Sequence, residues 1–177
     1  MMNKEFRELY NSDMVRYEKG ARRGYTKHFS YYFRKCQTTH NRFLKTYYRC
    51  RFKCLKDKHG IEVSYNTQIG KGLYIGHPYN ITINSDSVIG ENCNIHKGVT
   101  IGQENRGKRQ GVPTIGNCVW IGINAVIVGK VHIGNDVLIA PNSYVNCDVP
   151  DHSIVFGNPC IIKHSDRATE HYINRTV

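Results

Sequence analysis

The sequence predicts a mainly β fold, a parallel β-helix prism that follows a short α-helical region. From residue 63 an aliphatic residue returns every six positions, and a small residue often comes directly after it. The first 60 residues hold sixteen Lys and Arg against five Asp and Glu, whereas the remainder holds nine of each. A chain of 177 residues can form one sizeable core and a smaller appendage. We therefore divide the chain into a basic helical region (1–60), a β-helix domain (61–163) and a C-terminal tail (164–177).

The basic N-terminal region carries apolar side chains at helical spacing, which predicts two or three helices with a break near residues 37–41. Gly20 and Gly24 interrupt the first pattern. The three apolar stripes are Phe6, Leu9, Tyr10, Met14 and Tyr17; Phe29, Tyr32, Phe33 and Cys36; and Phe43, Leu44, Tyr47, Cys54 and Leu55. Three interpretations stay open: a helical cap packed on the prism with a solvated basic face, adsorption to an anionic membrane surface, or attraction of an acidic polymer. No nucleic-acid fold signature is present, so we expect no nucleic-acid partner.

The six-residue period is the main signal for the β-helix, because neither a helix of period 3.6 nor a strand of period 2 produces it. One inward side chain per short strand and three strands per coil give a triangular prism with one continuous core. We place a two-residue slip after Ile81 and a longer interruption at 103–113. The thirteen core positions are Val63, Ile69, Ile75, Ile81, Ile89, Ile95, Ile101, Ile115, Ile121, Ile127, Ile133, Ile139 and Val145.

The interruption at 103–113 is polar and contains glycine, so it cannot contribute to an aliphatic core. We expect an extruded loop that is either a tolerated surface insertion or a flap over the cleft of a neighbouring subunit. Its side chains Arg106, Lys108 and Arg109 suit an anionic group such as a phosphate.

The composition also predicts the cellular location of the protein. The first thirty residues carry charges throughout, which predicts no signal peptide, and no stretch reaches the roughly 18 apolar residues of a membrane span. The seven scattered cysteines indicate free thiols in a reducing compartment. We expect a cytoplasmic protein, with the inner face of the membrane as a variant of that location.

The Ile-Gly units and the ending Gly157-Asn158-Pro159 resemble the hexapeptide-repeat acyltransferases. The resemblance covers about residues 61–163 and implies a left-handed prism, although parallel crossovers are usually right-handed. Three segments resemble the serine acetyltransferase branch. They are Ile61–Gly70, which carries the acidic Glu62; Ile75-Gly76-His77-Pro78; and the run Asn94–Gly102 before the loop.

That resemblance implies acetyl-CoA as co-substrate and a hydroxyl as acceptor. His77 would be the general base, since imidazole is the side chain whose usual pKa lies near 7, and Glu62 would orient it. His96 follows Ile95, which stacks on Ile75 one coil later, so His96 should neighbour His77. It is a candidate for acceptor binding, for a second base or for a purely structural role.

The co-substrate leaves no phosphate-loop motif. By resemblance, Gly102, Ala125 and Ser143 would line its arm, with Lys163 near the nucleotide end and Arg106 and Lys108 on its phosphates. We expect no metal, because His77 and His96 lack a third nearby histidine. One flat-sided prism has no deep pocket, so we expect a homotrimer with active sites between subunits.

Two departures from the branch concern the acceptor. Gly76 stands where the branch has an Asp before its catalytic His, and Gly111-Val112 replaces an Arg-His pair that helps to hold serine. The predicted function is therefore O-acetylation of a saccharide hydroxyl, in the manner of the serine-acetyltransferase-like enzymes of surface polysaccharides. The alternatives are serine O-acetylation for cysteine biosynthesis and a non-catalytic trimeric scaffold.

Overall fold

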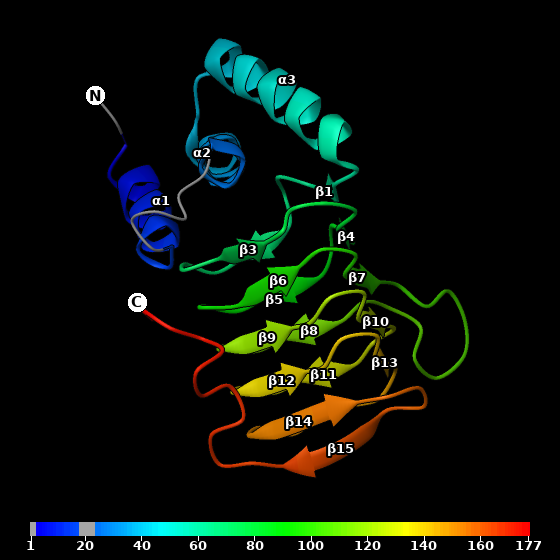
Figure 1. Cartoon of the computed structure of the whole chain (residues 1–177). Helices are drawn as coiled ribbons and strands as arrows, with labels where there is room; N and C mark the ends of the chain where they lie inside the picture. The colour runs from blue at the N-terminus through cyan, green and yellow to red at the C-terminus, as the bar shows by residue number, and fades with distance from the viewer. Residues whose placement is uncertain (1–2, 18–23) are drawn as a thin grey trace.

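Three helices lie at one end of the molecule, above a stack of short strands (Figure 1). The structure is a computed structural model that describes residues 3–17 and 24–177. The helices are α1 (Lys4–Val15), α2 (Gly24–Thr38) and α3 (Arg42–His59), so the predicted break near 37–41 is confirmed, while the break at Gly20 lies outside the described residues. Gly60 ends α3 in a left-handed conformation, as expected of a glycine after a helix. Within the described ranges, no helix is long and apolar enough to cross a membrane.

The stacked strands form a parallel β-solenoid with three sheets. Sheet A contains β1 (Glu62–Val63), β4 (Thr82–Ile83), β7 (Thr100–Gly102), β10 (Val126–Val128) and β13 (Tyr144–Val145). Sheet B contains β2 (Gln68–Ile69), β5 (Val88–Ile89), β8 (Thr114–Ile115) and β11 (His132–Ile133). Sheet C contains β3 (Tyr74–Gly76), β6 (Asn94–His96), β9 (Val119–Ile121), β12 (Val137–Ile139), β14 (Ser153–Phe156) and the antiparallel β15 (Ile161–His164). The chain visits the sheets in turn and adds one strand to each face per coil, except that the last coil meets sheet B only through the bridge between Ile133 and Val149.

The core of the prism is the predicted column of aliphatic side chains. All thirteen predicted positions are at most 7% exposed, which confirms the period of six. The predicted slip is one turn too late, however. Ile83, not Ile81, pairs with Val63 and with Ile101 in sheet A. The two extra residues therefore lie in the turn 77–80. Ile81 is also buried, although it precedes β4.

The helices cap the open end of the prism with polar side chains. The first coil has no preceding coil to take its backbone hydrogen bonds, and such an edge needs partners. Arg34 donates to the carbonyls of Ile69 and Gly70, Gln37 to Thr67 and Lys56 to Val63, while the N–H groups of Gly72, Leu73 and Ile75 donate to Ser12, Asp13 and Tyr17. Some of the Lys and Arg side chains of the N-terminal region are therefore buried where the helices contact the prism, and these do not belong to a solvated basic face.

The C-terminal tail returns along the outside of the prism toward α1 (Figure 1). Its start is fixed by Asp136, which accepts hydrogen bonds from the backbone of Ala168 and Thr169 and from the Thr169 hydroxyl. Farther on, Asn94 donates to the carbonyl of Tyr172 and Arg16 donates to that of Asn174. The tail therefore forms a wall over the outer face of sheet C.

Candidate active site

His77 lies in the turn that joins β3 of sheet C to β4 of sheet A, the same turn that carries the two extra residues. Its side chain is exposed, and its backbone is left-handed with φ of 53°, as is that of Asn80. Other turns of the prism share this conformation, among them those at Asn92, Asn124 and Asn142, so it belongs to the repeat and does not by itself mark a functional position. The turn is held at the end of α3, because the Asn80 N–H donates to the carbonyl of His59 and the Tyr79 ring packs on the His59 ring.

His96 lies next to this turn, as the sequence predicts. Its backbone pairs with Gly76 across β3 and β6, one residue before His77. The His96 ring occupies the space over Gly76, because a Cβ built on Gly76 would collide with the ring atoms Nδ1 and Cε1. Glycine at 76 and histidine at 96 are therefore coupled by packing, and an aspartate at 76 would not fit beside this ring.

The His96 ring is packed and electrically neutral at neutral pH. Burial lowers its pKa to about 4, and the neighbouring His77 adds to that effect. Its Nε2 atom is buried without a hydrogen-bond partner among the described residues. The ring contacts Trp120, with centroids 4.8 Å apart. A pKa of about 4 makes this ring a weak proton acceptor at neutral pH, so of the three predicted roles the packing favours ligand positioning or a structural role over that of a second base.

Glu62, the predicted orienting carboxylate, lies in β1 of sheet A with its side chain exposed, opposite Thr82. In the described part of the chain, no hydrogen bond or ion pair links it to His77. The strand of Glu62 pairs with β4, the strand that follows the His77 turn, so the two residues lie along the same edge of the prism, and the assignment of Glu62 stays a prediction.

Two of the predicted co-substrate residues share the prism edge that carries His77. Ala125 and Ser143 lie in the later turns between sheets C and A, and they accept hydrogen bonds from Thr100 and Val126 of the strands beside them. Both are buried, so a ligand on this edge would meet the half-buried Val126 and Tyr144 that follow them. Gly102 pairs with Val128 in the same sheet. These assignments also stay predictions.

The predicted loop leaves the prism after β7 and returns at β8 as a short hairpin (Figure 1). Glu104 and Gly111 form an antiparallel bridge, and Arg109 donates to the Glu104 carboxylate at 3.1 Å. Arg106 and Lys108 are exposed at the tip. Arg106 also lines a cleft of about 640 Å³ with Val128 and Tyr144, which opens on the outer face of sheet A. Lys163 lies in β15 at the far end of the prism, with its ammonium group 5.6 Å from the centre of the Phe156 ring.

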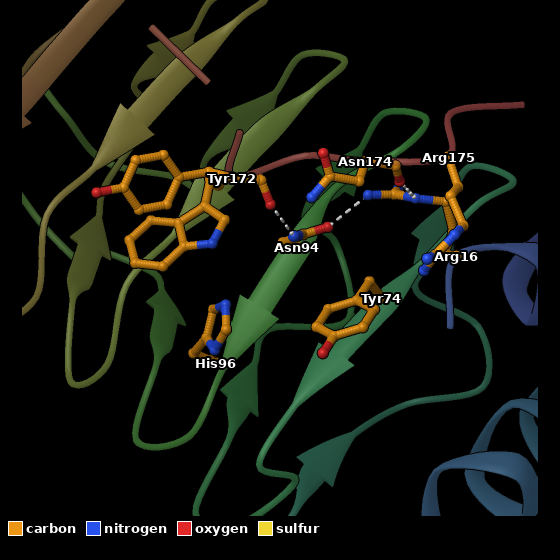
Figure 2. Close-up of a pocket in the computed structure, with 8 residues that line it drawn as sticks. Arg16, Tyr74, Asn94, His96, Tyr172, Asn174 and Arg175 are labelled. Carbon is orange, nitrogen blue, oxygen red and sulfur yellow. Dashed lines mark hydrogen bonds between the residues drawn. The ribbon is translucent and has the colours of Figure 1, made fainter. Parts of the chain in front are cut away.

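A pocket on the outer face of sheet C is the feature that sequence reasoning missed. It has a volume of about 270 Å³, and its walls come from Arg16 at the C-terminal end of α1, three neighbouring strands and the tail (Figure 2). The lining residues are Arg16, Tyr74, Asn94, His96, Trp120, Tyr172, Asn174 and Arg175. Only the place of His96 beside His77 was predicted. The other residues are not periodic, and no sequence signal shows that the tail folds back onto this face.

No group of three or more His, Cys, Asp or Glu side chains is arranged to hold a metal in residues 3–17 and 24–177. All seven cysteines are free thiols. Burial raises the pKa of the Cys93 thiol to about 12, so this sulfur stays protonated and is not a nucleophile.

Comparisons with known proteins agree with this geometry. The family model described as bacterial transferase hexapeptide (six repeats) matches residues 113–147. A serine acetyltransferase of Helicobacter pylori is 35% identical over 108 residues, which cover 61% of this chain and 63% of the relative. A solved serine acetyltransferase of Neisseria gonorrhoeae in complex with serine has a TM-score of 0.74 at 25% identity, covering 90% of this chain and 69% of that one. The Brucella abortus serine acetyltransferase in complex with coenzyme A gives a TM-score of 0.77 at 21% identity, covering 92% and 69%.

The fold and its repeat thus define a hexapeptide-repeat protein built on a left-handed parallel β-helix. Within that class the chain is similar to serine acetyltransferases in both sequence and fold. The chain spans 63% of the length of the Helicobacter relative, and 50% of a Staphylococcus aureus serine acetyltransferase to which it is 39% identical.

Proposed function

We propose that this protein is an acetyl-CoA-dependent O-acetyltransferase with His77 as its general base. The observation that carries the proposal is the position of His77. It stands in an exposed, left-handed turn on the prism edge that also holds Ala125 and Ser143, beside a second, neutral histidine. The similarity to serine acetyltransferases, one of them solved with coenzyme A, supports an acetyl donor of that kind.

The proposed reaction needs one base and two substrates held together. His77 takes the proton of the acceptor hydroxyl while that oxygen bonds to the acetyl carbon, the carbon–sulfur bond breaks, and the coenzyme thiolate leaves and receives the proton. A positioned general base contributes roughly 10²–10⁴ in rate, and holding both partners in contact contributes further. His96 would assist through its neutral ring, and Glu62 would orient His77 in the assembled protein.

The names of the relatives support L-serine as the acceptor. A saccharide hydroxyl is the second candidate, and two features of this chain favour it. The His96 ring fills the place where the branch has an acidic side chain, so His77 has no neighbouring carboxylate at 76 to meet the ammonium group of an amino acid. Gly111-Val112 likewise provides no Arg-His pair at the end of the loop.

We further propose that the protein is a cytoplasmic homotrimer with its active sites between subunits. A single prism offers only open clefts, so the loop 103–113 of one subunit would cover the edge of the next.

A peripheral contact with the inner face of the membrane is proposed for α3. Phe43, Leu44 and Tyr47 are exposed there, in a helix rich in Lys and Arg, and basic residues near an anionic surface contribute about 1 kcal/mol each.

Acetyl-CoA turnover by the full chain tests the proposed function. Loss of the thioester absorbance is the better readout, because the exposed thiols of Cys50 and Cys54 would react with a thiol reagent. The acceptor panel contains L-serine, neutral sugars and acidic sugars. We expect turnover with one class and a loss of about 10²–10⁴ in kcat/KM for His77→Ala.

His132→Ala is the matched control, an exposed histidine on sheet B away from this edge. Turnover with serine alone would establish the serine acetyltransferase activity. An unchanged His77→Ala rate would overturn the role of His77. Absence of both turnover and acetyl-CoA binding by calorimetry would overturn the enzyme and leave a scaffold.

A further inference from the structure

We propose that Cys147 and Cys160 are a modification site, at which the two thiols form a reversible disulfide that ties the last hairpin of the prism to the turn after β13. The oxidant is a small-molecule disulfide, with oxidised glutathione as the probe. The two sulfur atoms are in contact as a thiol–thiol hydrogen bond, 3.5 Å apart. This inference goes beyond the proposed function and does not depend on acetyl transfer.

The backbone holds Cys147 in place on both sides. Before it, β13 pairs with β10, and after it the chain crosses from sheet A to sheet B, where Val149 forms a bridge to Ile133. The Asp148 carboxylate accepts a hydrogen bond from the His132 N–H, and the Val149 N–H donates to the His132 carbonyl. The turn is therefore fastened to the preceding coil, and the Cys147 side chain starts from a fixed position.

Cys160 approaches from the other side of the contact. It ends the turn 157–160, which joins β14 to the antiparallel β15 at the end of the prism opposite the helices (Figure 1). The Gly157 carbonyl accepts a hydrogen bond from the Tyr144 N–H at the start of β13. This bond holds the turn against the last coil and brings Cys160 beside Cys147.

The pair combines proximity with access. Both side chains are half-buried, so a small disulfide can reach them. Two thiols that separate turns hold in contact have a high effective concentration for each other. In residues 3–17 and 24–177, no other two cysteine sulfurs are hydrogen-bonded to each other. The remaining cysteines are Cys36 and Cys93, which are buried, Cys118, which is half-buried, and Cys50 and Cys54, which are exposed on α3.

Cys160 is the thiol that reacts first. Burial raises the pKa of the Cys147 thiol to about 11, and its hydrogen bond to Cys160 adds to this effect, so Cys147 keeps its proton. The Cys160 thiolate attacks one sulfur of oxidised glutathione, the S–S bond of that molecule breaks, and one glutathione leaves as a thiolate. Cys147 then loses its proton and attacks the Cys160 sulfur, which releases the second glutathione. Two electrons and two protons pass from the pair to one glutathione disulfide, which gives two glutathione thiols.

The disulfide strengthens the end of the prism that the helices do not cover. It joins two cysteines 13 positions apart and so closes a short loop that contains β14. A cross-link that closes a loop of this size lowers the unfolding equilibrium constant by up to roughly 10²-fold, because it removes conformations from the unfolded chain. β15 begins directly after Cys160, so its start is fixed by the same bond.

A redox titration of the full chain tests the pair. The variant Cys50→Ser/Cys54→Ser serves as the background, because the exposed thiols of α3 would also take up glutathione. The protein is equilibrated with defined ratios of reduced and oxidised glutathione, free thiols are alkylated, and linked peptides are quantified by mass spectrometry. We expect one linkage within a single molecule, between residues 147 and 160, and its loss on return to reduced glutathione.

Single variants in the same background identify the two thiols and their order. Cys147→Ser and Cys160→Ser should both abolish the linkage, and Cys147→Ser should retain glutathione on Cys160. Cys118→Ser is the matched control, because Cys118 is another half-buried cysteine of the prism and should leave the linkage unchanged.

Comparison with the unfolded chain shows whether the fold positions the pair. The equilibrium constant for oxidation should be at least about tenfold larger in the folded protein than in the urea-unfolded chain. Because the two equilibria are linked, the disulfide must lower the unfolding equilibrium constant by the same factor. Urea unfolding of the oxidised and the reduced protein is therefore an independent readout.

Each outcome decides the proposal. Glutathione on single cysteines without the 147–160 linkage, or a linkage between two molecules on a non-reducing gel, would overturn it. Equal oxidation of the folded and unfolded chains would show that the fold does not hold the thiols together, and would overturn it as well. An equal loss of linkage in Cys118→Ser would overturn the choice of partners, and glutathione retained equally by both single variants would overturn the order of attack.

Discussion

The prism and its helical cap are held together by opposite kinds of contact. Inside the prism, one aliphatic side chain stacks on the next through every coil, and the column contains no charge. Where the cap meets the first coil, the contact depends on buried polar side chains, among them Asp13, Arg16 and Arg34, which are at most 4% exposed. Inside the prism, each coil supplies hydrogen-bonding partners for the backbone of the next, so apolar side chains alone can fill the core. The backbone groups of a terminal coil have no further coil to bond to, so polar side chains must take that place.

The largest expected effect is at the capped end. Arg34 donates to both oxygens of Asp13 and to two carbonyls of the first coil. Arg34→Met leaves the Asp13 carboxylate buried and unpaired, which should lower the free energy of unfolding by about 3–5 kcal/mol. Urea unfolding at a fixed protein concentration measures it, since any oligomer adds a concentration term.

Two controls show whether the loss comes from the uncompensated charge. Arg51→Met removes an exposed arginine of α3 and should change stability by no more than about 0.5 kcal/mol. The double variant Asp13→Leu/Arg34→Met should recover part of the loss, because it removes both buried charges. A double variant less stable than Arg34→Met would show that the backbone contacts of Asp13, and not its charge, hold the cap.

The next effect is inside the column. Ile121 is fully buried in the middle coil, between Ile95 and Ile139. Ile121→Ala should lower the free energy of unfolding by about 2–5 kcal/mol, through lost apolar burial and the cavity left behind. Val88→Ala, at an outward strand position that is 37% exposed, is the control and should change little. A loss for Ile121→Ala below that of Val88→Ala would mean that the coils collapse around the cavity.

The same contrast explains what the sequence could predict. The period of six predicted the prism, its core and the extruded loop, because every strand needs one inward aliphatic side chain at the same position. The slip at Ile81 was placed wrongly because Ile81 and Ile83 are both apolar, and only strand pairing distinguishes them. The neighbourhood of His77 and His96 followed from coil stacking. The sheet C pocket did not, because Arg16, Trp120 and Tyr172 come together only through the folding of α1 and the tail onto one face.

At the candidate site, Gly76 of β3 and the His96 ring of β6 are packed directly against each other. Gly76→Ala would force the His96 ring away from its place over the strand, since the added Cβ would collide with it. We expect a loss of about 1–3 kcal/mol from overpacking, together with a change in Trp120 emission, because that ring contacts His96. Gly102→Ala, whose Cβ would lie 3.5 Å from the nearest atom, is the control and should fit. Equal losses for the two variants would show that His96 moves freely.

The smallest effect is a pH dependence that separates the packed His96 from the exposed histidines. Burial holds its pKa at about 4 in the folded protein, against an ordinary value of 6.5 in the unfolded chain. Above pH 6.5 the ring is neutral in both states and contributes nothing. As the pH falls from 6.5 to 4, the unfolded chain binds the proton first, so stability decreases over this window. The ring is partly exposed, so we expect about 1 kcal/mol.

His152 acts in the opposite direction, because its hydrogen bond to Asp136 raises its pKa and favours the folded state at low pH. The comparison is therefore between slopes: His96→Gln should flatten the decrease between pH 6.5 and 4 in urea unfolding, and His132→Gln should not. An unchanged slope in His96→Gln would mean that the ring gains a proton as easily in the folded protein as in the unfolded chain, and that the site beside His77 is open to water.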